Sequence, residues 1–274
     1  MTMKVQHKNL IDIKKNPHIF KNPLYSFSVS SRLIRNEINA LKYLQFLYVY
    51  LEISQIKTVF GSTTDFSDFY GGRVYSANKS LTNEHIELLS DNNINIALTL
   101  TNHFFSEEIY LNNKLFLEKY HKEGNVIICT SDELAKKIRK DFPLYKLRAS
   151  IIKNANTLNK VNKALELYDD VVIPMDMNDD DDFLESLPEK SRIMLFANAS
   201  CAYDCPARSC YADISKRNTS QSLKINCTRK KIGTLESAFY FFDVEKFHKM
   251  GFTNFKMIPI KMELETNIVG DNEL

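Results

Sequence analysis

The sequence predicts an α/β fold and, within that class, a closed (β/α)8 barrel of the TIM type. Eight short apolar segments recur along the 274 residues, with helical patterns between them. Several of these segments, such as NVIIC, DVVIP and RIMLF, are apolar throughout, as strands covered on both faces are. The length also suits one barrel, which takes about 250 residues. An open, doubly wound sheet would give the same local signals and remains the alternative.

The expected strands begin with a segment in which Ser alternates with Phe and Val, and the later ones are rich in Val and Ile. In chain order they are Tyr25–Ser31, Lys57–Thr63, Ile94–Asn102, Asn125–Ser131, Tyr145–Ile152, Asp170–Met177, Ser191–Ser200 and Phe255–Lys261. We expect a single barrel domain over residues 1–274, with 1–22 as an N-terminal extension and 200–231 as a metal-binding loop inserted after the seventh strand.

Helical segments fill the intervals between these strands. The clearest is SDELAKKIRKDFP, which opens with a capping serine and ends at a proline. The expected helices are Leu33–Ile53, Thr82–Ser90, Glu107–Lys122, 131–143, Thr157–Tyr168, Asp180–Ser186 and Leu235–Met250. About 13 residues follow the last strand. We therefore expect the eighth helix to be short or missing, which would leave that edge of the barrel open or covered by a protein partner.

Composition and charge narrow the functional classes only slightly. The 36 basic and 34 acidic residues give a net charge of +2, which neither indicates nor excludes nucleic-acid binding. The most apolar segment, Leu41–Ile53, contains Lys42 and Glu52 and is too short to span a membrane. The first 20 residues lack the apolar core of a secretion signal. We expect a cytoplasmic protein without membrane contact, where clustered cysteines are metal ligands or redox groups more often than disulfides.

Three of the five cysteines lie directly after the seventh strand and a fourth follows further along, with the spacing Cys201-x3-Cys205-x4-Cys210-x16-Cys227. Residues after the carboxyl ends of barrel strands meet at one mouth, where barrel enzymes have their active sites. Four thiolates satisfy either a tetrahedral metal ion or a four-iron cluster. Nearby basic residues would offset the negative charge of the thiolates: Arg208, Lys216, Arg217, Arg229, Lys230 and Lys231.

The spacing favours an iron–sulfur cluster over zinc. Structural zinc sites pair their cysteines in separate C-x2–4-C knuckles. The gap between Cys201 and Cys205 fits that pattern, but the gap from Cys205 to Cys210 does not make a second knuckle. Zinc stays open as the alternative metal. Cys129, at the end of the fourth strand, is expected to be a small buried hydrophobe.

Three residues are candidates for a substrate pocket at the barrel mouth. Arg73 follows two glycines after the second strand, and its guanidinium matches an anionic group such as a carboxylate. Asn102 and His103 end the third strand, so we expect them to face the mouth. Arg148 lies inside the fifth strand, where it needs a carboxylate partner such as Asp176 or a position near the metal centre.

Three motifs resemble the collagenase-like peptidase family of unassigned catalytic type. They are GGR at 71–73, N-x-x-C-x-x-x-C-P-x-R at 198–208 and MGFTNFKMIPIK at 250–261. That family includes oxygen-independent hydroxylases of ubiquinone biosynthesis and of ribosomal and transfer RNA. The resemblance implies a barrel that carries a [4Fe–4S] cluster on Cys201, Cys205, Cys210 and Cys227. The sequence departs from the family where ANAS replaces a glycine-rich signature before the first cysteine, and we expect it to be without the long additional C-terminal domain of many members.

The expected function is that of an iron–sulfur barrel enzyme, with oxygen-independent hydroxylation or related redox chemistry on a small organic or RNA substrate. The main alternative is a non-catalytic binding or assembly protein in which zinc or a cluster pins the loop Ser200–Lys231. A radical S-adenosylmethionine enzyme is a minor alternative, because its C-x3-C-x2-C motif follows the first strand. A peptidase is another, although HExxH and GxSxG motifs are absent from the sequence.

Overall fold

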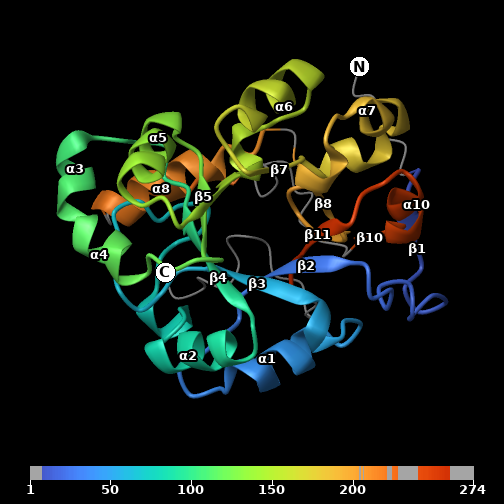
Figure 1. The fold of residues 1–274 in the computed structure, drawn as a ribbon, viewed down its shortest axis with the longest axis horizontal. Helices are drawn as coiled ribbons and strands as arrows, with labels where there is room; N and C mark the ends of the chain where they lie inside the picture. Colours follow the sequence, from blue (N-terminus) through green and yellow to red (C-terminus); the bar gives the residue numbers. More distant parts are fainter. Residues whose placement is uncertain (1–7, 204, 206, 221–223, 228–239, 260–274) are drawn as a thin grey trace.

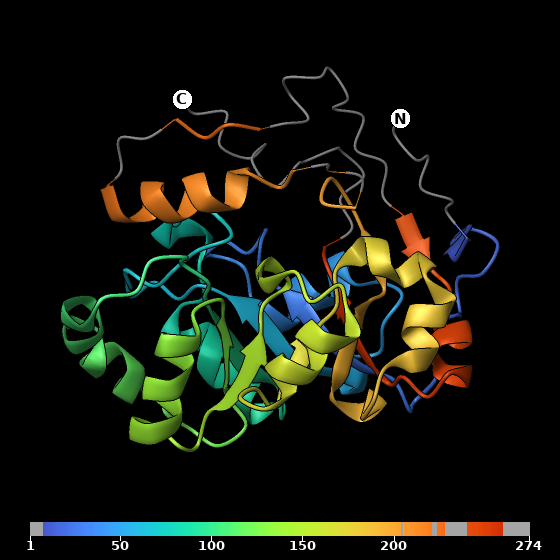
Figure 2. The same cartoon turned by 90° about the horizontal axis from the view of Figure 1, so that it is seen from above.

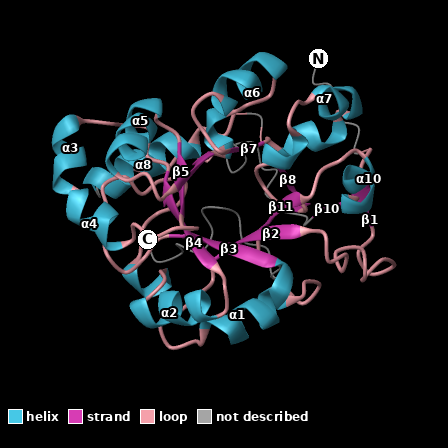
Figure 3. Cartoon of the chain, viewed as in Figure 1, coloured by secondary structure: helices cyan, strands magenta, loops and turns pink. Residues whose placement is uncertain are grey.

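Eight parallel strands close into a ring, which confirms the predicted (β/α)8 barrel (Figures 1 and 3). The computed structural model describes residues 8–203, 205, 207–220, 224–227 and 240–259. The ring closes because the last strand pairs with both the first and the seventh, which excludes the open sheet. In ring order the strands are β11 (Asn254–Met257), β2 (Ser26–Ser30), β3 (Ile56–Gly61), β4 (Asn95–Leu100), β5 (Val126–Cys129), β6 (Lys146–Ala149), β7 (Asp170–Val172) and β8 (Ile193–Phe196).

Helices surround the ring, and one lies across its mouth. Residue Ser131 caps the helix that follows β5, as its sequence predicts, by accepting a hydrogen bond from the backbone N–H of Leu134. The helices are α1 (Ala40–Leu47), α2 (Asn83–Asp91), α3 (Glu107–Asn112), α4 (Lys114–Lys119), α5 (Asp132–Asp141), α6 (Leu158–Leu165), α7 (Asp181–Ser186), α8 (Cys210–Ser220) and α10 (Val244–Lys249). Short 3-10 turns lie at η1 (Ile53–Gln55), η2 (Ala77–Lys79), η3 (Ile151–Lys153), η4 (Met175–Asp179) and η5 (Lys190–Arg192). Helix α8, orange in Figure 2, lies over the barrel.

Three of the expected helices were wrong in extent. The segment 33–53 is helical mainly over α1, because Asn39 caps a later start by accepting from the N–H groups of Leu41 and Lys42. The segment 107–122 divides into α3 and α4 at Asn113. In the segment 235–250, only residues 240–250 are described, and they begin with a strand rather than a helix.

That strand belongs to a small antiparallel sheet that the sequence did not predict. Its order is β1-β10-β9, with β1 (Leu10–Ile11), β10 (Tyr240–Phe242) and β9 (Asn198–Ala199). Next to it, Phe20 is fully buried and its ring packs against Phe241 and against Phe27 of β2. The described part of the N-terminal extension is therefore attached to the outside of the barrel. Residues 260–274, where a partner-covered edge was expected, lie outside the described residues.

The barrel interior contains a buried ion pair. Arg148 of β6 donates from Nε and Nη2 to the two carboxylate oxygens of Asp170 on β7, at 2.5 and 3.0 Å. Its Nη1 crosses the ring to donate to Ser28 Oγ of β2 at 3.0 Å, and Thr58 Oγ1 of β3 donates to the same oxygen. The expected carboxylate partner of Arg148 is therefore present, but it is Asp170 on the neighbouring strand and not Asp176.

Candidate functional site

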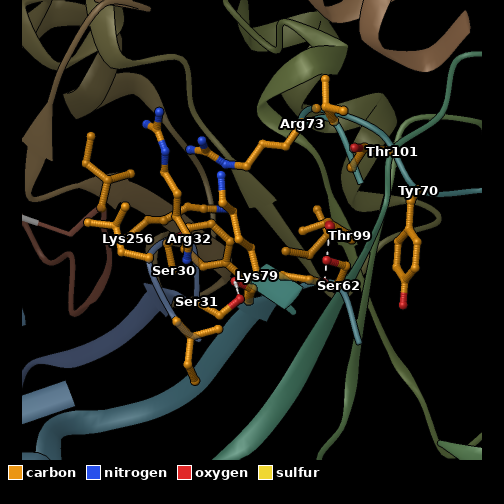
Figure 4. Close-up of a pocket in the computed structure, with 18 of the residues that line it drawn as sticks. Ser30, Ser31, Arg32, Ser62, Tyr70, Arg73, Lys79, Thr99, Thr101 and Lys256 are labelled. Atoms are coloured by element: carbon orange, nitrogen blue, oxygen red, sulfur yellow. Dashed lines mark hydrogen bonds between the residues drawn. The ribbon is translucent and has the colours of Figure 1, made fainter. Parts of the chain in front are cut away.

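The carboxyl ends of the strands open into a cavity of about 740 Å³ (Figure 4). Barrel strands contribute Ser30, Gly61, Thr99, Phe196 and other residues to its wall, and the loops that follow β2 and β3 contribute many of the others. This is the end of a (β/α)8 barrel at which enzymes of this architecture bind and convert their substrates. Aromatic and aliphatic side chains line much of the cavity, so it can hold a carbon skeleton as well as polar groups.

Every charged side chain among the described residues that line the cavity is cationic. Figure 4 shows Arg32 and Arg73 reaching into it from the loops after β2 and β3. Cationic walls of low dielectric attract anions, and guanidinium groups bind carboxylate or phosphate oxygens in pairs. The cationic residues are Arg32, Arg35, Lys42, Arg73, Lys79 and Lys256.

Lys256 is the most deeply buried of these cations. It points into the barrel from β11 and is only 5% exposed. Its Nζ lies 3.9 Å from the centroid of the Phe60 ring, and among the described residues it makes no hydrogen bond or ion pair. Burial, aided by the nearby charges of Arg148 and Arg73, lowers the pKa of this amine to about 7, and Asp170 opposes the shift.

The two glycines of the GGR motif place Arg73. A Cβ on Gly71 would lie 2.5 Å from the backbone of Thr101 and Asn102, and Gly72 has a φ of 75°. Asn218 of α8 then fixes the loop, since its Nδ2 donates to the Arg73 carbonyl at 2.8 Å. Burial lowers the pKa of the Arg73 side chain, while the nearby Tyr211 and Cys201 raise it. Arg73 thus lies between the cavity and the cysteine segment.

The four clustered cysteines are half-buried free thiols that influence one another. Burial raises the pKa of Cys210 to about 12, and the negative charges of Cys201, Cys205 and Cys227 raise it further. The other three thiols therefore lie close enough to Cys210 to affect its ionisation. Within the described ranges, no group of three or more His, Cys, Asp or Glu side chains is already arranged to hold a metal ion. Whether the thiols bind a metal stays a prediction.

Arg208 organises the turn between the second and third of these cysteines. It adopts a φ of 47°, and its backbone N–H donates to Cys205 Sγ at 3.3 Å. Its side chain donates to the carbonyl of Ala202 and, at 2.5 Å, to a carboxylate oxygen of Asp176 in η4. The expected positive charge is thus present at the thiols. The segments with Arg229, Lys230 and Lys231 lie outside the described residues, and Lys216 and Arg217 are on α8.

Tyr211 connects the cysteine group with the cavity. It follows Cys210 in the sequence and lines the cavity. Burial raises the pKa of its phenol, and the charges of Cys201 and Cys210 raise it further, so the ring lies close to both thiols. Ser200, which precedes Cys201, also lines the cavity. The sequence reasoning missed Tyr211, although its position beside a candidate ligand was a usable signal.

Asn102 and His103 are not among the described residues that line the cavity. They hold α8 on the loop after β4: Asn102 Nδ2 donates to the carbonyls of Asp68 and Ser215, and His103 Nδ1 lies 2.9 Å from Ser215 Oγ. Ser215 is fully buried, so this pair fastens the helix and does not present an accessible nucleophile. Of the three pocket candidates, the structure places Arg73 in the cavity wall. Cys129 is buried in the hydrophobic core, as expected.

Comparison with known proteins supports the fold of this chain. No family model matches the sequence, and no curated protein matches it. None of the described helices has both the length and the apolar character that a membrane span needs. A solved structure reported as that of the U32 peptidase Mk0906 superposes with a TM-score of 0.60 and 10% identity, over 88% of this chain and 94% of that chain. At this identity the likeness concerns the fold alone: the chain has a barrel similar to that of this peptidase, which is the fold that the collagenase-like resemblance implies.

Proposed function

We propose that this protein is an iron–sulfur barrel enzyme that binds an anionic organic substrate in the cationic cavity. The reaction would be a redox step, such as an oxygen-independent hydroxylation. One observation carries the proposal: Tyr211 and Ser200 belong to the cavity wall and are the sequence neighbours of Cys210 and Cys201. A redox centre that exchanges electrons with a substrate must lie near it, so a cluster on these cysteines would suit a substrate in the cavity.

The chemistry of the thiols fits a four-iron cluster. Such a cluster takes four thiolates, each on a different iron, and it would supply one-electron transfer when bound. A single zinc ion, with Zn–S bonds of about 2.3 Å and tetrahedral angles, would need its sulfurs about 3.8 Å apart. The cluster therefore demands a less compact arrangement than zinc does. Arg73 and Arg208 place positive charge near Cys201 and Cys205, which would offset part of the negative charge of four metal-bound thiolates.

The other residues of the site bind and orient the substrate. The guanidinium groups of Arg32 and Arg73 suit a carboxylate or phosphate. The apolar walls at Phe60, Ile128 and Phe196 suit its carbon skeleton and limit the access of water.

Anaerobic purification tests the metal centre. The protein should be brown, with broad absorbance near about 400 nm and with iron and sulfide in equal amounts. The Cys205→Ser variant should lose most of the iron. The Cys129→Ala variant is its control and should keep the iron, because Cys129 is buried in the core. Colourless protein with stoichiometric zinc would instead support a binding or assembly protein with a structural zinc site.

Anion binding tests the cavity independently of the metal. Lactate and phosphate should raise the melting temperature of the protein, and uncharged propane-1,2-diol should not. The Arg73→Met variant should bind lactate about 10 to 100 times more weakly, because a hydrogen bond between charged groups contributes about 1.5–3 kcal/mol. Arg139→Met is the matched control, since Arg139 is on α5 and pairs with Asp169 outside the cavity. Equal lactate affinity of the Arg73 variant and the native protein would contradict an anion site at Arg73.

A further inference from the structure

Lys256 is placed differently from the other cavity cations. The arginines reach in from loops, whereas Lys256 extends from barrel strand β11 and is held between its neighbours in the ring. Its Nζ borders the cavity and has no hydrogen-bond or ion-pair partner among the described residues. An amine that is this buried, is aimed into a cavity and has no hydrogen-bond or ion-pair partner among the described residues is available to a ligand.

The groups around Lys256 favour its neutral form. The amine is buried, and Arg148 on β6 and Arg73 on the loop after β3 are positive. Asp170 on β7 is the nearby carboxylate, but both of its oxygens already accept hydrogen bonds from Arg148. Losing a proton removes the repulsion from both arginines at once. Enzymes activate nucleophilic lysines in this way, by burial and by placing them beside other cations.

We propose that Lys256 is a nucleophilic amine that forms an imine with the aldehyde or ketone group of an anionic substrate, the simplest class being the 2-oxo acids. Arg73 binds the carboxylate, and the carbonyl carbon next to it then lies towards Lys256. The lone pair of the amine forms the C–N bond, and the carbonyl oxygen leaves as water with the two amine protons. This step requires neither an oxidant nor a reductant. The inference rests on the proposed anion site and is independent of the iron–sulfur cluster.

Reductive trapping tests the proposal on the full-length protein. The protein is incubated for a short fixed time with pyruvate, excess borohydride is added, and the labelled lysines are identified by peptide mass spectrometry. Lys256 should carry the adduct. Trapping should rise about tenfold between pH 6 and pH 8, as expected for an amine with a pKa of about 7. Lys190 is an internal control outside the cavity: it also lies over an aromatic ring, that of Phe252, but donates to the Met250 carbonyl.

Variants and a matched ligand separate imine formation from anion binding. Lys256→Arg keeps a cation at this position and Lys256→Met removes it, and both should lose the adduct while they remain folded. Lactate has the charge of pyruvate without its carbonyl group, so it should compete with pyruvate and leave no adduct. If pyruvate raises the melting temperature of the native protein but Lys256 remains unlabelled, the imine is refuted and the anion site stands. If neither pyruvate nor lactate binds, the anion site is refuted as well.

Discussion

The buried pair between Arg148 and Asp170 makes a strong prediction about stability. Replacing Arg148 with Met removes three hydrogen bonds and leaves Asp170, whose side chain is 19% exposed, without its partner. Breaking a buried pair on one side costs about 3–5 kcal/mol. Lys256 offsets part of this loss. Without Arg148 the pKa of Lys256 rises, and its ammonium group can then neutralise the charge of Asp170. We therefore expect the free energy of unfolding to fall by about 3 kcal/mol.

Urea unfolding followed by circular dichroism at pH 8 measures this loss. In a Lys256→Met background no amine can compensate, so Arg148→Met should cost more there than in the native protein. The control is Arg139→Met, which breaks an exposed pair with Asp169 and should cost at most about 1 kcal/mol. A loss below about 1 kcal/mol for Arg148→Met, or an equal loss in the two backgrounds, would refute the reasoning.

Three further predictions concern a thiol, a carboxylate and an amine. Cys129→Ala should lower the free energy of unfolding by about 1 kcal/mol in urea titrations, because it leaves only a small cavity in the core. Asp176→Asn removes the charge that holds Arg208 beside Cys205, so iron should transfer to a chelator several times faster in anaerobic absorbance assays. The pKa of Lys256, about 7 in the folded protein, lies below its unfolded value of about 10.4. The unfolded chain therefore binds more protons above pH 7, and the free energy of unfolding should rise from pH 7 to pH 8, by less in Lys256→Met.

The sequence was sufficient to predict the barrel, but it did not predict the smaller elements. Strands such as Val126–Cys129 are apolar throughout, because helices cover one face and the barrel interior the other. The strand Leu10–Ile11 is too short to show any period, and the pair Phe241–Phe242 suits a helix face as well as a strand. Helix α8 has no continuous apolar face, and contacts from Asn218 and His103 hold it in place. Such contacts are absent from local sequence patterns.

The candidate site likewise contains some residues that the sequence indicated and others that it did not. Cysteine spacing made Cys201 and its neighbours candidate ligands, because cluster ligands lie close together in the sequence, and this stays a prediction. GGR pointed to Arg73, because glycines mark a tight turn, and the structure places Arg73 in the cavity wall. Arg32, Lys79 and Lys256 come from three distant segments that meet only when the ring closes. No spacing rule connects them. A lysine within the apolar segment FKMIPIK was the one available signal for Lys256.

Closure of the strand ring also determines when the barrel can be completed during synthesis of the chain. Ser26 pairs with Asn254, so the first barrel strand must wait for nearly the whole chain before it gains its second neighbour. Until β11 leaves the ribosome, β2 and β8 are open edges that can pair with other chains. Lys256 lies on that final strand, so the cavity acquires its buried amine in the same step that seals the ring. A nascent chain without β11 thus lacks this reactive group and is at the same time most exposed to aggregation.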